Sequence, residues 1–461
     1  MIELREYQKS ILRTALKYNT LVVLPTGLGK TLIAFHALQR FNRALFLAPT
    51  KPLIEQHYKN FISRFFQDAT LATGSIKDRN YNARFVFATP QTIVSDMDVL
   101  SKNSFEYIVF DEAHRAVGNY DYVNIARYFS NARTLGLTAS PGYKREKIEE
   151  IINNLRIQMI EYRSENDPEV LDYLHIKRIL TIMVDLPRDY REIIDSISNR
   201  IVDMRKGLEN VFKMKLTKYN VEEVSKRIEE MSDEKKWRIW QDYSKFLTYL
   251  HLKELLEIQS IDAALKYLDS LRDNGSRAQQ EVISEFYELL SESKSTLHPK
   301  MQELIRIIQS KGDMQGIVFT QYKAQIFYMS DILTSKNILH DILIGKSGSR
   351  KKQMESINRF LNREVKVLLS SSVGEEGLDL PGADYVIFYE SVPSPIRVIQ
   401  RMGRTGRFRD GEVYVLIAKG TYDEISYKVA KRRIKTMYEL LDSLRRELAN
   451  KNTKRTLFDQ I

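Results

Sequence analysis

Short apolar runs recur in two parts of the chain, and each run is separated from the next by a segment long enough for a helix. In the first part, the runs lie at residues 21–24, 44–47, 85–87, 107–110 and 134–137. In the second part, they lie at residues 316–319, 341–344, 365–369, 385–388 and 413–417. Unbroken apolar runs of this kind are typical of parallel strands buried on both faces. The pattern therefore predicts an α/β fold with two parallel-sheet domains.

The segment between these two parts has a different pattern. It contains little Pro or Gly and many Lys, Glu, Leu and Ile residues at helical spacing, which predicts a helical insertion. We expect domain 1 over residues 1–162, the insertion over 163–297, domain 2 over 298–448 and a polar tail over 449–461. More helix is expected at residues 421–448.

Composition narrows the class of protein. At 461 residues, the chain is too long for one typical domain and long enough for two or three. It has no cysteine, so disulfides and thiolate metal sites are excluded. We expect a cytoplasmic, nucleoid-associated protein without a membrane partner, because there is no long apolar span and no signal-like N-terminus. The formal charge of +11 is compatible with a polyanionic partner but is weak support for one.

The sequence LPTGLGKT at residues 24–31 has the features of a phosphate-binding turn. An apolar run ends at Leu24, Gly27 and Gly29 allow a tight turn, and Lys30 and Thr31 begin a helical segment. Such a turn directs backbone N–H groups at phosphate oxygens, while the lysine contacts the β and γ phosphates and the threonine binds Mg²⁺. The strict pattern has glycine where this chain has Leu24, so a tight turn with a surface lysine is the alternative.

A second motif, YIVFDEAH at residues 107–114, supports the nucleotide site. Four apolar residues deliver Asp111 and Glu112 to the carboxyl end of the predicted sheet, which is where open α/β sheets bind ligands. One carboxylate can hold Mg²⁺, and the next can polarise the attacking water. An acidic pair after a strand can also be a solvated strand end, but its occurrence downstream of the glycine-rich turn favours the site.

A third motif, QRMGRTGR at residues 400–407, lies in the second part of the chain. Its arginines are three residues apart, while its two glycines make it a poor helix, so a purely solvated basic helix is a weak explanation. Together with APTKPLIEQ, ATPQT, LTASP, VFTQ and SSVGEEGLDLP, these motifs resemble those of the superfamily 2 helicases in their order. The resemblance covers most of both parts of the chain.

The resemblance implies two RecA-like domains with ATP and Mg²⁺ in the cleft between them. The expected catalytic residues are Lys30, Asp111, Glu112, Gln400, Arg404 and Arg407, with Glu112 as general base and the two arginines reaching across as arginine fingers. The expected nucleotide-binding residues are Arg5, Gln8, Thr26, Gly27, Gly29, Lys30, Thr31, Gly377 and Asp379, and the metal ligands are Thr31 and Asp111. Phosphates of the polynucleotide would meet Thr50, Thr89, Thr320 and Ser372. Coupling of hydrolysis to movement would involve Gln400, His114, Thr138 and Ser140, the last two in an LTASP segment that departs from the commoner SAT form.

Within the superfamily, the helical insertion between the motor domains resembles the branch that contains the Hef, FANCM and Mph-like helicases, the RIG-I-like sensors and Dicer. The RNA members of that branch usually have DECH where this chain has DEAH, which favours forked or branched DNA as the partner. A duplex-RNA-stimulated ATPase and a non-catalytic, ATP-locked nucleic-acid clamp are the alternatives.

The insertion has aromatic residues every three positions, with basic residues between them. The aromatic residues are Trp237, Trp240, Tyr243, Phe246 and Tyr249. An aromatic stripe on a helix usually packs in a core, whereas basic residues beside rings can grip a polynucleotide. We expect the rings mainly to pack and Lys235, Lys236 and Arg238 to contact DNA.

The C-terminal part of the chain bears on two expected partners, a sliding clamp and a separate nuclease. KRTLFDQI at residues 454–461 resembles sliding-clamp-binding peptides, in which Leu457 and Phe458 would enter an apolar pocket of the clamp PCNA. A frayed tail is the alternative, since the usual leading glutamine is replaced by Lys454. No ERKxxxD-like nuclease cluster is seen, so any DNA incision is expected from a separate nuclease.

Overall fold

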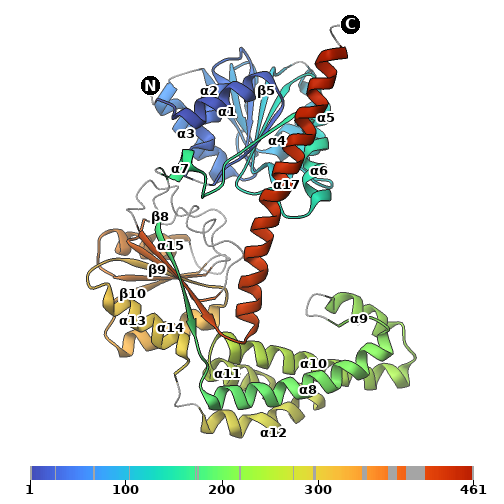
Figure 1. Ribbon diagram of the computed structural model, residues 1–461, viewed down its shortest axis with the longest axis vertical. Coiled ribbons are helices and arrows are strands. Elements are labelled where there is room, and N and C mark those ends of the chain that lie inside the picture. The colour runs from blue at the N-terminus through green and yellow to red at the C-terminus, as the bar shows by residue number, and fades with distance from the viewer. Residues whose placement is uncertain are drawn as a thin grey trace.

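The computed structural model describes most of the chain. The described residues are 3–25, 27–65, 68–102, 104–171, 173, 176–216, 220–273, 275–293, 297–344, 350–371, 382–390 and 411–458. Figure 1 shows domain 1 at one end of the molecule, with domain 2 and a helical insertion at the other.

Domain 1 is a parallel sheet with helices packed on both faces (Figure 1). Among the described residues, the sheet has the strand order β3-β4-β2-β5-β6-β1-β7. The strands are β3 (Ala69–Ala72), β4 (Phe85–Ala88), β2 (Ala44–Leu47), β5 (Tyr107–Asp111), β6 (Arg133–Thr138), β1 (Thr20–Val23) and β7 (Met159–Tyr162). One face carries α1 (Glu6–Lys17), α2 (Lys30–Leu38), α3 (Lys51–Phe65) and α7 (Pro168–Leu171). The other carries α4 (Pro90–Ser95), α5 (Asp121–Tyr128) and α6 (Arg145–Asn154). Residues of β1 alternate between the two apolar cores, as strands covered on both faces must.

Domain 2 repeats this arrangement. Its sheet has the order β10-β11-β9-β12-β13-β8 over the part of the chain that the structure describes, and every pair is parallel. The strands are β10 (His340–Leu343), β11 (Val367–Ser371), β9 (Gly316–Thr320), β12 (Tyr385–Phe388), β13 (Gly411–Ala418) and β8 (Ile176–Val184). The helices α13 (Pro299–Ser310), α14 (Lys323–Ser335) and α15 (Arg350–Leu361) cover them. The predicted fold class, with two parallel-sheet domains, is confirmed.

The insertion is helical and has a core of its own. It comprises α8 (Arg188–Phe212), α9 (Val221–Glu229), α10 (Asp233–Ile258), α11 (Ile261–Arg272) and α12 (Arg277–Glu292). The helical prediction for residues 163–297 was wrong at β8, which pairs with β13 along Ile176–Val184 at the edge of the second sheet. An edge strand has a neighbour on one side only and tolerates polar residues. Strand β8 mixes the polar residues Lys177 and Arg178 with apolar ones, so it lacks the unbroken run of a central strand.

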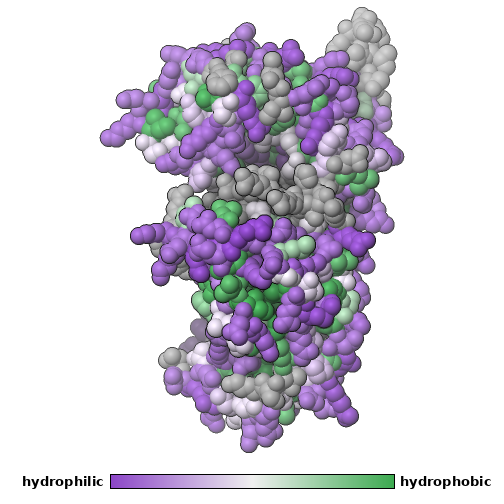
Figure 2. All heavy atoms as spheres, turned by 90° about the vertical axis from the view of Figure 1, so that its left-hand side faces the viewer, coloured by the Kyte–Doolittle hydropathy of each residue, from purple (hydrophilic) through white to green (hydrophobic). Residues whose placement is uncertain are grey.

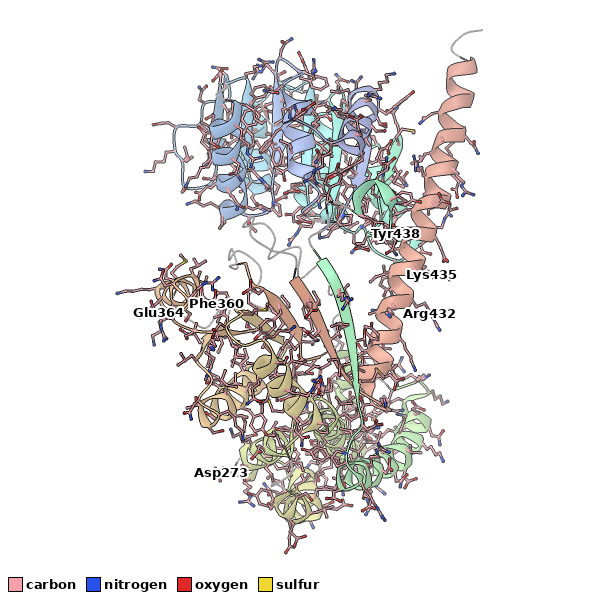
Figure 3. The ribbon with its side chains drawn as sticks, turned by 60° about the vertical axis from the view of Figure 1, so that its left-hand side comes forward. Asp273, Phe360, Glu364, Arg432, Lys435 and Tyr438 are labelled. Carbon is pink, nitrogen blue, oxygen red and sulfur yellow. The ribbon has the colours of Figure 1, made fainter. Side chains whose placement is uncertain are left out.

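A single long helix links the two motor domains. Helix α17 (Tyr422–Phe458) starts shortly after β13 in domain 2 and runs past β7 and the start of α6 to the far end of domain 1 (Figure 1). Its residues Met437, Leu441 and Leu444 belong to the apolar core of domain 1. Figure 3 shows Arg432 and Lys435 on the stretch between the domains. The helix is longer than the 421–448 segment predicted from sequence.

One face of the molecule is mainly hydrophilic (Figure 2). In Figure 2, hydrophilic residues dominate the face shown, and hydrophobic ones gather around its middle. Among the described residues, none of the helices has the length and apolar character needed to span a membrane.

Candidate functional site

The glycine-rich turn connects β1 to α2 at the carboxyl end of the first sheet. Gly27 and Gly29 have φ angles of 82° and 77°, in the left-handed region that glycine tolerates best. Lys30 is the first residue of α2, so backbone N–H groups without helical partners lie at this turn. Such a helix start attracts phosphate oxygens.

The departure at Leu24 has a structural explanation. Leu24 is fully buried, and its backbone N–H donates to the Thr138 carbonyl oxygen at 3.2 Å, which extends the contact between β1 and β6. Leu24 therefore packs in the core at the position where the strict phosphate-binding pattern has glycine. Lys30 Nζ donates to the Leu24 carbonyl oxygen at 2.8 Å, so the lysine lies over the turn that it is expected to share with phosphate.

Helix α1 holds the turn from its other side. Both Tyr7 Oη and Gln8 Nε2 donate to the Leu28 carbonyl oxygen, at 2.7 and 3.0 Å. Gln8 Oε1 also accepts from the Arg5 backbone N–H at 2.9 Å. Of these two predicted nucleotide-binding residues, Gln8 therefore contacts the glycine-rich turn directly, and Arg5 is bonded to Gln8.

These residues share one cavity of about 360 Å³. Its lining includes the predicted residues Arg5, Gln8, Gly27, Gly29, Lys30, Thr31 and Asp111. Helix α3 contributes Gln56, the last residue of the APTKPLIEQ motif, together with His57, Asn60 and Arg64, which the sequence motifs did not indicate. The structure thus brings together predicted residues from the start of the chain, the glycine-rich turn and the end of β5, which span more than a hundred positions.

Asp111 ends β5 at the floor of this cavity and is 5% exposed. Its Oδ2 lies 2.9 Å from His57 Nε2, and its Oδ1 accepts from the Glu112 backbone N–H at 3.0 Å. Tyr122 Oη donates to its carbonyl oxygen at 2.7 Å, and burial raises the Tyr122 pKa well above its usual value. These contacts fix the carboxylate, and His57 is a neighbour that sequence reasoning missed.

Glu112 has an unusual backbone and lies beside the residues predicted to couple hydrolysis to movement. Its φ and ψ are 52° and 48°, a left-handed conformation that costs a non-glycine residue about 1–3 kcal/mol. Its Oε2 lies 3.4 Å from His114 Nδ1, and the same nitrogen lies 3.2 Å from Thr138 Oγ1. The Ser140 backbone N–H donates to Thr138 Oγ1 at 3.1 Å. His114, Thr138 and Ser140 thus form one connected group that ends at Glu112.

The threonines predicted to meet polynucleotide phosphates differ in exposure. Thr50 is exposed just before α3. Thr89 and Thr320 are 8% and 1% exposed, and the Thr89 hydroxyl lies 2.8 Å from the Thr92 hydroxyl. Thr320 Oγ1 donates to Glu390 Oε1 at 2.6 Å, so in this conformation its proton is not available to a phosphate.

Glu390 is a second residue that the motifs missed. It follows β12, is buried, and accepts from the Gln321 backbone N–H at 3.0 Å as well as from Thr320. Burial raises its pKa to about 7, and the nearby Lys300 opposes that rise. Glu390 therefore fixes the turn that follows β9.

The remaining predicted residues fall into two groups. Thr26, Ser372, Gly377, Asp379, Gln400, Arg404 and Arg407 lie outside the described residues. Leu457 and Phe458 lie in the last turn of α17, with side chains that are also outside the described set. The predicted nucleotide site is therefore described for its domain 1 residues.

The aromatic stripe of the insertion contains residues that are buried in its core, as expected, and one that is exposed. Tyr243, Phe246 and Tyr249 are each 1% exposed and pack in the core of the insertion. Trp237, by contrast, is 64% exposed, between the exposed Arg238 and the half-buried Lys236. An exposed indole among basic side chains is suited to stacking on bases while cations meet phosphates.

Comparison with known proteins places this site in a family. Residues 1–143 match the type III restriction enzyme res subunit family, and residues 299–409 match the helicase conserved C-terminal domain. The crystal structure of the Hef helicase domain from Pyrococcus furiosus is 37% identical, with a TM-score of 0.76 over 92% of this chain and 98% of that one.

Two curated relatives extend the comparison. A Methanocaldococcus jannaschii protein whose name describes an ATP-dependent RNA helicase is 34% identical over 96% of this chain and 61% of its own length. The ATP-dependent DNA helicase fml1 of Schizosaccharomyces pombe is 31% identical over 95% of this chain and 60% of its own length. The chain thus spans about three-fifths of the length of these relatives.

The chain belongs to the superfamily 2 helicases, a class of ATP hydrolases. Within the class, it belongs to the group that includes Hef, the Mph1 and fml1 DNA helicases and the Fanconi anemia group M proteins. The resemblance seen in its motifs is confirmed.

Changing Gly29 to Ala should weaken nucleotide binding through Gln8. A Cβ at Gly29 would overlap with Gln8 Nε2, so the amide must leave the Leu28 carbonyl oxygen. Gly27→Ala is the matched control, because Gly27 is also left-handed but has no atom within 4 Å of the added Cβ. We expect the Kd of a fluorescent ATP analogue to rise about two- to tenfold more in Gly29→Ala than in Gly27→Ala. Equal values for the two variants would contradict this account.

Replacing Glu390 with Gln should change how stability depends on pH. Because the Glu390 pKa is raised from 4.5 to about 7 in the folded protein, its stabilising contribution is complete below about pH 4.5 and is lost as pH rises from there through about 7. As pH rises from 5 to 8, we expect the free energy of unfolding of Glu390→Gln to increase by about 2 kcal/mol relative to that of wild type. Thermal unfolding across this range measures the difference. Glu355→Gln, at an exposed position on α15, should show no such trend, and a parallel pH profile for Glu390→Gln and wild type would refute the prediction.

Proposed function

We propose that this chain uses ATP hydrolysis to move along and remodel forked or branched DNA in the repair of stalled replication. The main support is the similarity to the Hef helicase domain over 92% of the chain, which includes the insertion between the motor domains. The insertion presents Trp237 and Arg238 to solvent. The name of the S. pombe relative, an ATP-dependent DNA helicase, points the same way.

In the proposed ATP site, Lys30 binds the β and γ phosphates beside the backbone N–H groups at the start of α2. Thr31 and Asp111 supply the hydroxyl and carboxylate oxygens that Mg²⁺ prefers, and both line the same cavity, so the residues present fit the ion. When bound, Mg²⁺ would neutralise charge on the phosphate oxygens. Arg5 and Gln8 bind the adenine end, where Gln8 is already held against the turn.

Glu112 acts as general base in this proposal. It accepts a proton from the attacking water, and its left-handed backbone, supported by the contact with His114, holds the carboxylate at the end of β5. Domain 2 completes the site with Gly377, Asp379, Gln400 and the arginine fingers Arg404 and Arg407, as the family resemblance implies. Turnover then depends on closure of the two domains around the triphosphate.

The polynucleotide is proposed to cross both domains, along Thr50, Thr89, Thr320 and Ser372. Because the Thr89 and Thr320 hydroxyls are engaged within the protein, their roles in this conformation are to fix the turns after β4 and β9, over which the phosphates are proposed to lie. Contacts of this kind position a strand without reading its sequence. Binding should therefore be tolerant of sequence and sensitive to salt.

A second candidate function has one specific observation in its favour. The M. jannaschii relative carries a name that describes an RNA helicase, which supports a duplex-RNA-stimulated ATPase. A nucleic-acid clamp that binds ATP without turnover is a third. The sliding-clamp contact at Leu457 and Phe458 and the separate nuclease stay predictions.

An ATPase panel distinguishes these functions. Turnover is measured with forked DNA, linear duplex DNA and duplex RNA at matched nucleotide concentration. We expect the forked DNA to give the highest kcat, and Glu112→Gln to bind ATP but lose turnover by at least about a hundredfold, as expected for a lost general base. Strongest stimulation by duplex RNA would overturn the proposal in favour of the second candidate, and absence of turnover in wild type would favour the clamp.

The basic residues of the insertion should contribute to fork binding. We expect the triple change Lys235→Ala, Lys236→Ala and Arg238→Ala to reduce the slope of log K against log salt concentration by up to about 2–3, since each lost phosphate contact lowers it by about 0.7–0.9. Fluorescence anisotropy with labelled fork DNA measures this slope.

A matched control uses exposed lysines elsewhere on the insertion. They are Lys206, Lys213 and Lys266, changed together to Ala. This variant loses the same number of positive charges, so an equal reduction in the two triple variants would mean that only net charge matters.

A further inference from the structure

Helix α17 is anchored in domain 2 by a buried ion pair. Lys300 Nζ donates to Asp423 Oδ2 at 3.1 Å and to the Tyr389 carbonyl oxygen at 2.8 Å. The Lys300 and Asp423 side chains are 0% and 1% exposed. Because removing either partner would leave a buried charge uncompensated, the first turn of α17 is fixed relative to the second sheet.

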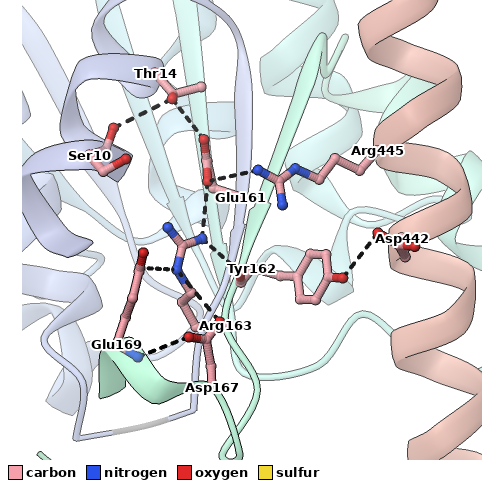
Figure 4. A network of polar contacts seen from close by, with 9 residues as sticks. All are labelled: Ser10, Thr14, Glu161, Tyr162, Arg163, Asp167, Glu169, Asp442 and Arg445. Atoms are coloured by element: carbon pink, nitrogen blue, oxygen red, sulfur yellow. Dashed lines mark hydrogen bonds and ion pairs between the residues drawn. The ribbon is translucent and has the colours of Figure 1, made fainter. Parts of the chain in front are cut away.

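The same helix is anchored in domain 1 by apolar and polar contacts. Met437, Leu441 and Leu444 are buried in the apolar core of that domain. Around them, Tyr162 Oη donates to Asp442 Oδ1 at 3.3 Å, and Arg445 lies 4.0 Å from Glu161 (Figure 4).

Further along the helix, Glu447 Oε2 accepts from Arg145 at 2.7 Å. At about 1.5 Å per residue, the 37 residues of α17 span about 55 Å. A helix anchored at both ends is a stiff connection between the domains.

One contact of α17 is with Ser140, which is linked to the proposed general base Glu112. Ser140 Oγ donates to Met437 Sδ at 3.0 Å, and both residues are buried. Close by, the Arg433 guanidinium lies over the Tyr143 ring at 4.6 Å. Ser140 is bonded through its N–H to Thr138, which contacts His114, which in turn contacts Glu112. Three residues therefore separate Met437 from the carboxylate proposed as general base.

We infer that Met437 is a positioning residue for ATP hydrolysis, through which α17 makes the geometry of the Glu112 segment depend on the position of domain 2. This inference rests on the proposed role of Glu112. A movement of domain 2 displaces the start of α17, and the stiff helix carries that displacement to Ser140. Because Glu112 has a left-handed backbone, its carboxylate depends on neighbours such as His114 for its placement. A small misplacement of a catalytic group is enough to lower its rate.

The contact can be tested by steady-state ATPase assays of Met437→Ala and Met437→Leu, with the polynucleotide that stimulates wild type most. We expect Met437→Ala to lower kcat about two- to tenfold, as for loss of one hydrogen-bonded contact in the transition state, with KM for ATP within about twofold of wild type. Met437→Leu keeps the apolar volume but lacks the sulfur acceptor, so it should lower kcat to a smaller extent.

The matched control is Leu444→Ala. Leu444 is 4% exposed in the same apolar core, but its shortening removes packing two turns away from Met437. We expect its kcat to stay within about twofold of wild type. Equal loss in Leu444→Ala and Met437→Ala would mean that docking of the helix matters rather than this contact, and would overturn the inference.

A double-mutant cycle with Ser140→Ala provides a second readout. If the contact acts as inferred, Met437→Leu should lower kcat further by less than about twofold in the Ser140→Ala background, because its partner is already absent. Additive losses would also overturn the inference. The Glu112→Gln variant, assayed in the same series, separates the two proposals: retained turnover there would refute the general-base role, whereas normal kcat in Met437→Ala and Met437→Leu would refute only the positioning role.

Discussion

The site depends on the parallel order of β5, β6 and β1, because parallel neighbours must end at the same edge of a sheet. β1 leads into the glycine-rich turn, β5 ends at Asp111, and β6 ends at Thr138. The bond from the Leu24 N–H to the Thr138 carbonyl oxygen continues this alignment one residue past β1. Segments that are far apart in sequence are therefore neighbours before any nucleotide binds. The same constraint acts in domain 2, where β9 and β12 are parallel neighbours and their ends bring Thr320 to Glu390.

Helix α17 adds a constraint that the sheets alone do not supply. Two parallel-sheet domains joined only through an insertion could take many relative positions. A helix whose first turn is held by Lys300 and whose middle is buried in domain 1 limits those positions. The polar contacts of Asp442 and Arg445 in Figure 4 involve β7, the edge strand beside β1. The helix therefore lies against the strand next to the one that carries the phosphate-binding turn.

The sequence predicted the central strands and the edge strand β10, and it missed three other edge strands for a physical reason. All ten predicted runs became strands, with ends shifted by at most two residues. The missed strands β3, β7 and β8 lie at sheet edges, where one neighbour is absent and polar residues are tolerated.

For the site, motifs of consecutive residues located Lys30 and Asp111. They could not locate Met437, whose partner is almost three hundred residues away. His57 had a usable signal, since it lies on the apolar face of α3 with Ile54 and Phe61.

Glu390 also had a signal, and comparing it with Asp111 shows why similar sequences serve different purposes. Each carboxylate comes just after the apolar residues of a parallel strand, in YIVFDE for Asp111 and in YVIFYE for Glu390. Asp111 lines a cavity, where its charge can be shared with a cation, and it is steadied by His57. Glu390 has its carboxylate oxygens taken by Thr320 and the Gln321 N–H, and burial raises its pKa. A carboxylate that follows a parallel strand lies at the carboxyl edge of the sheet. Its access to the cavity decides whether it binds a ligand or holds a turn.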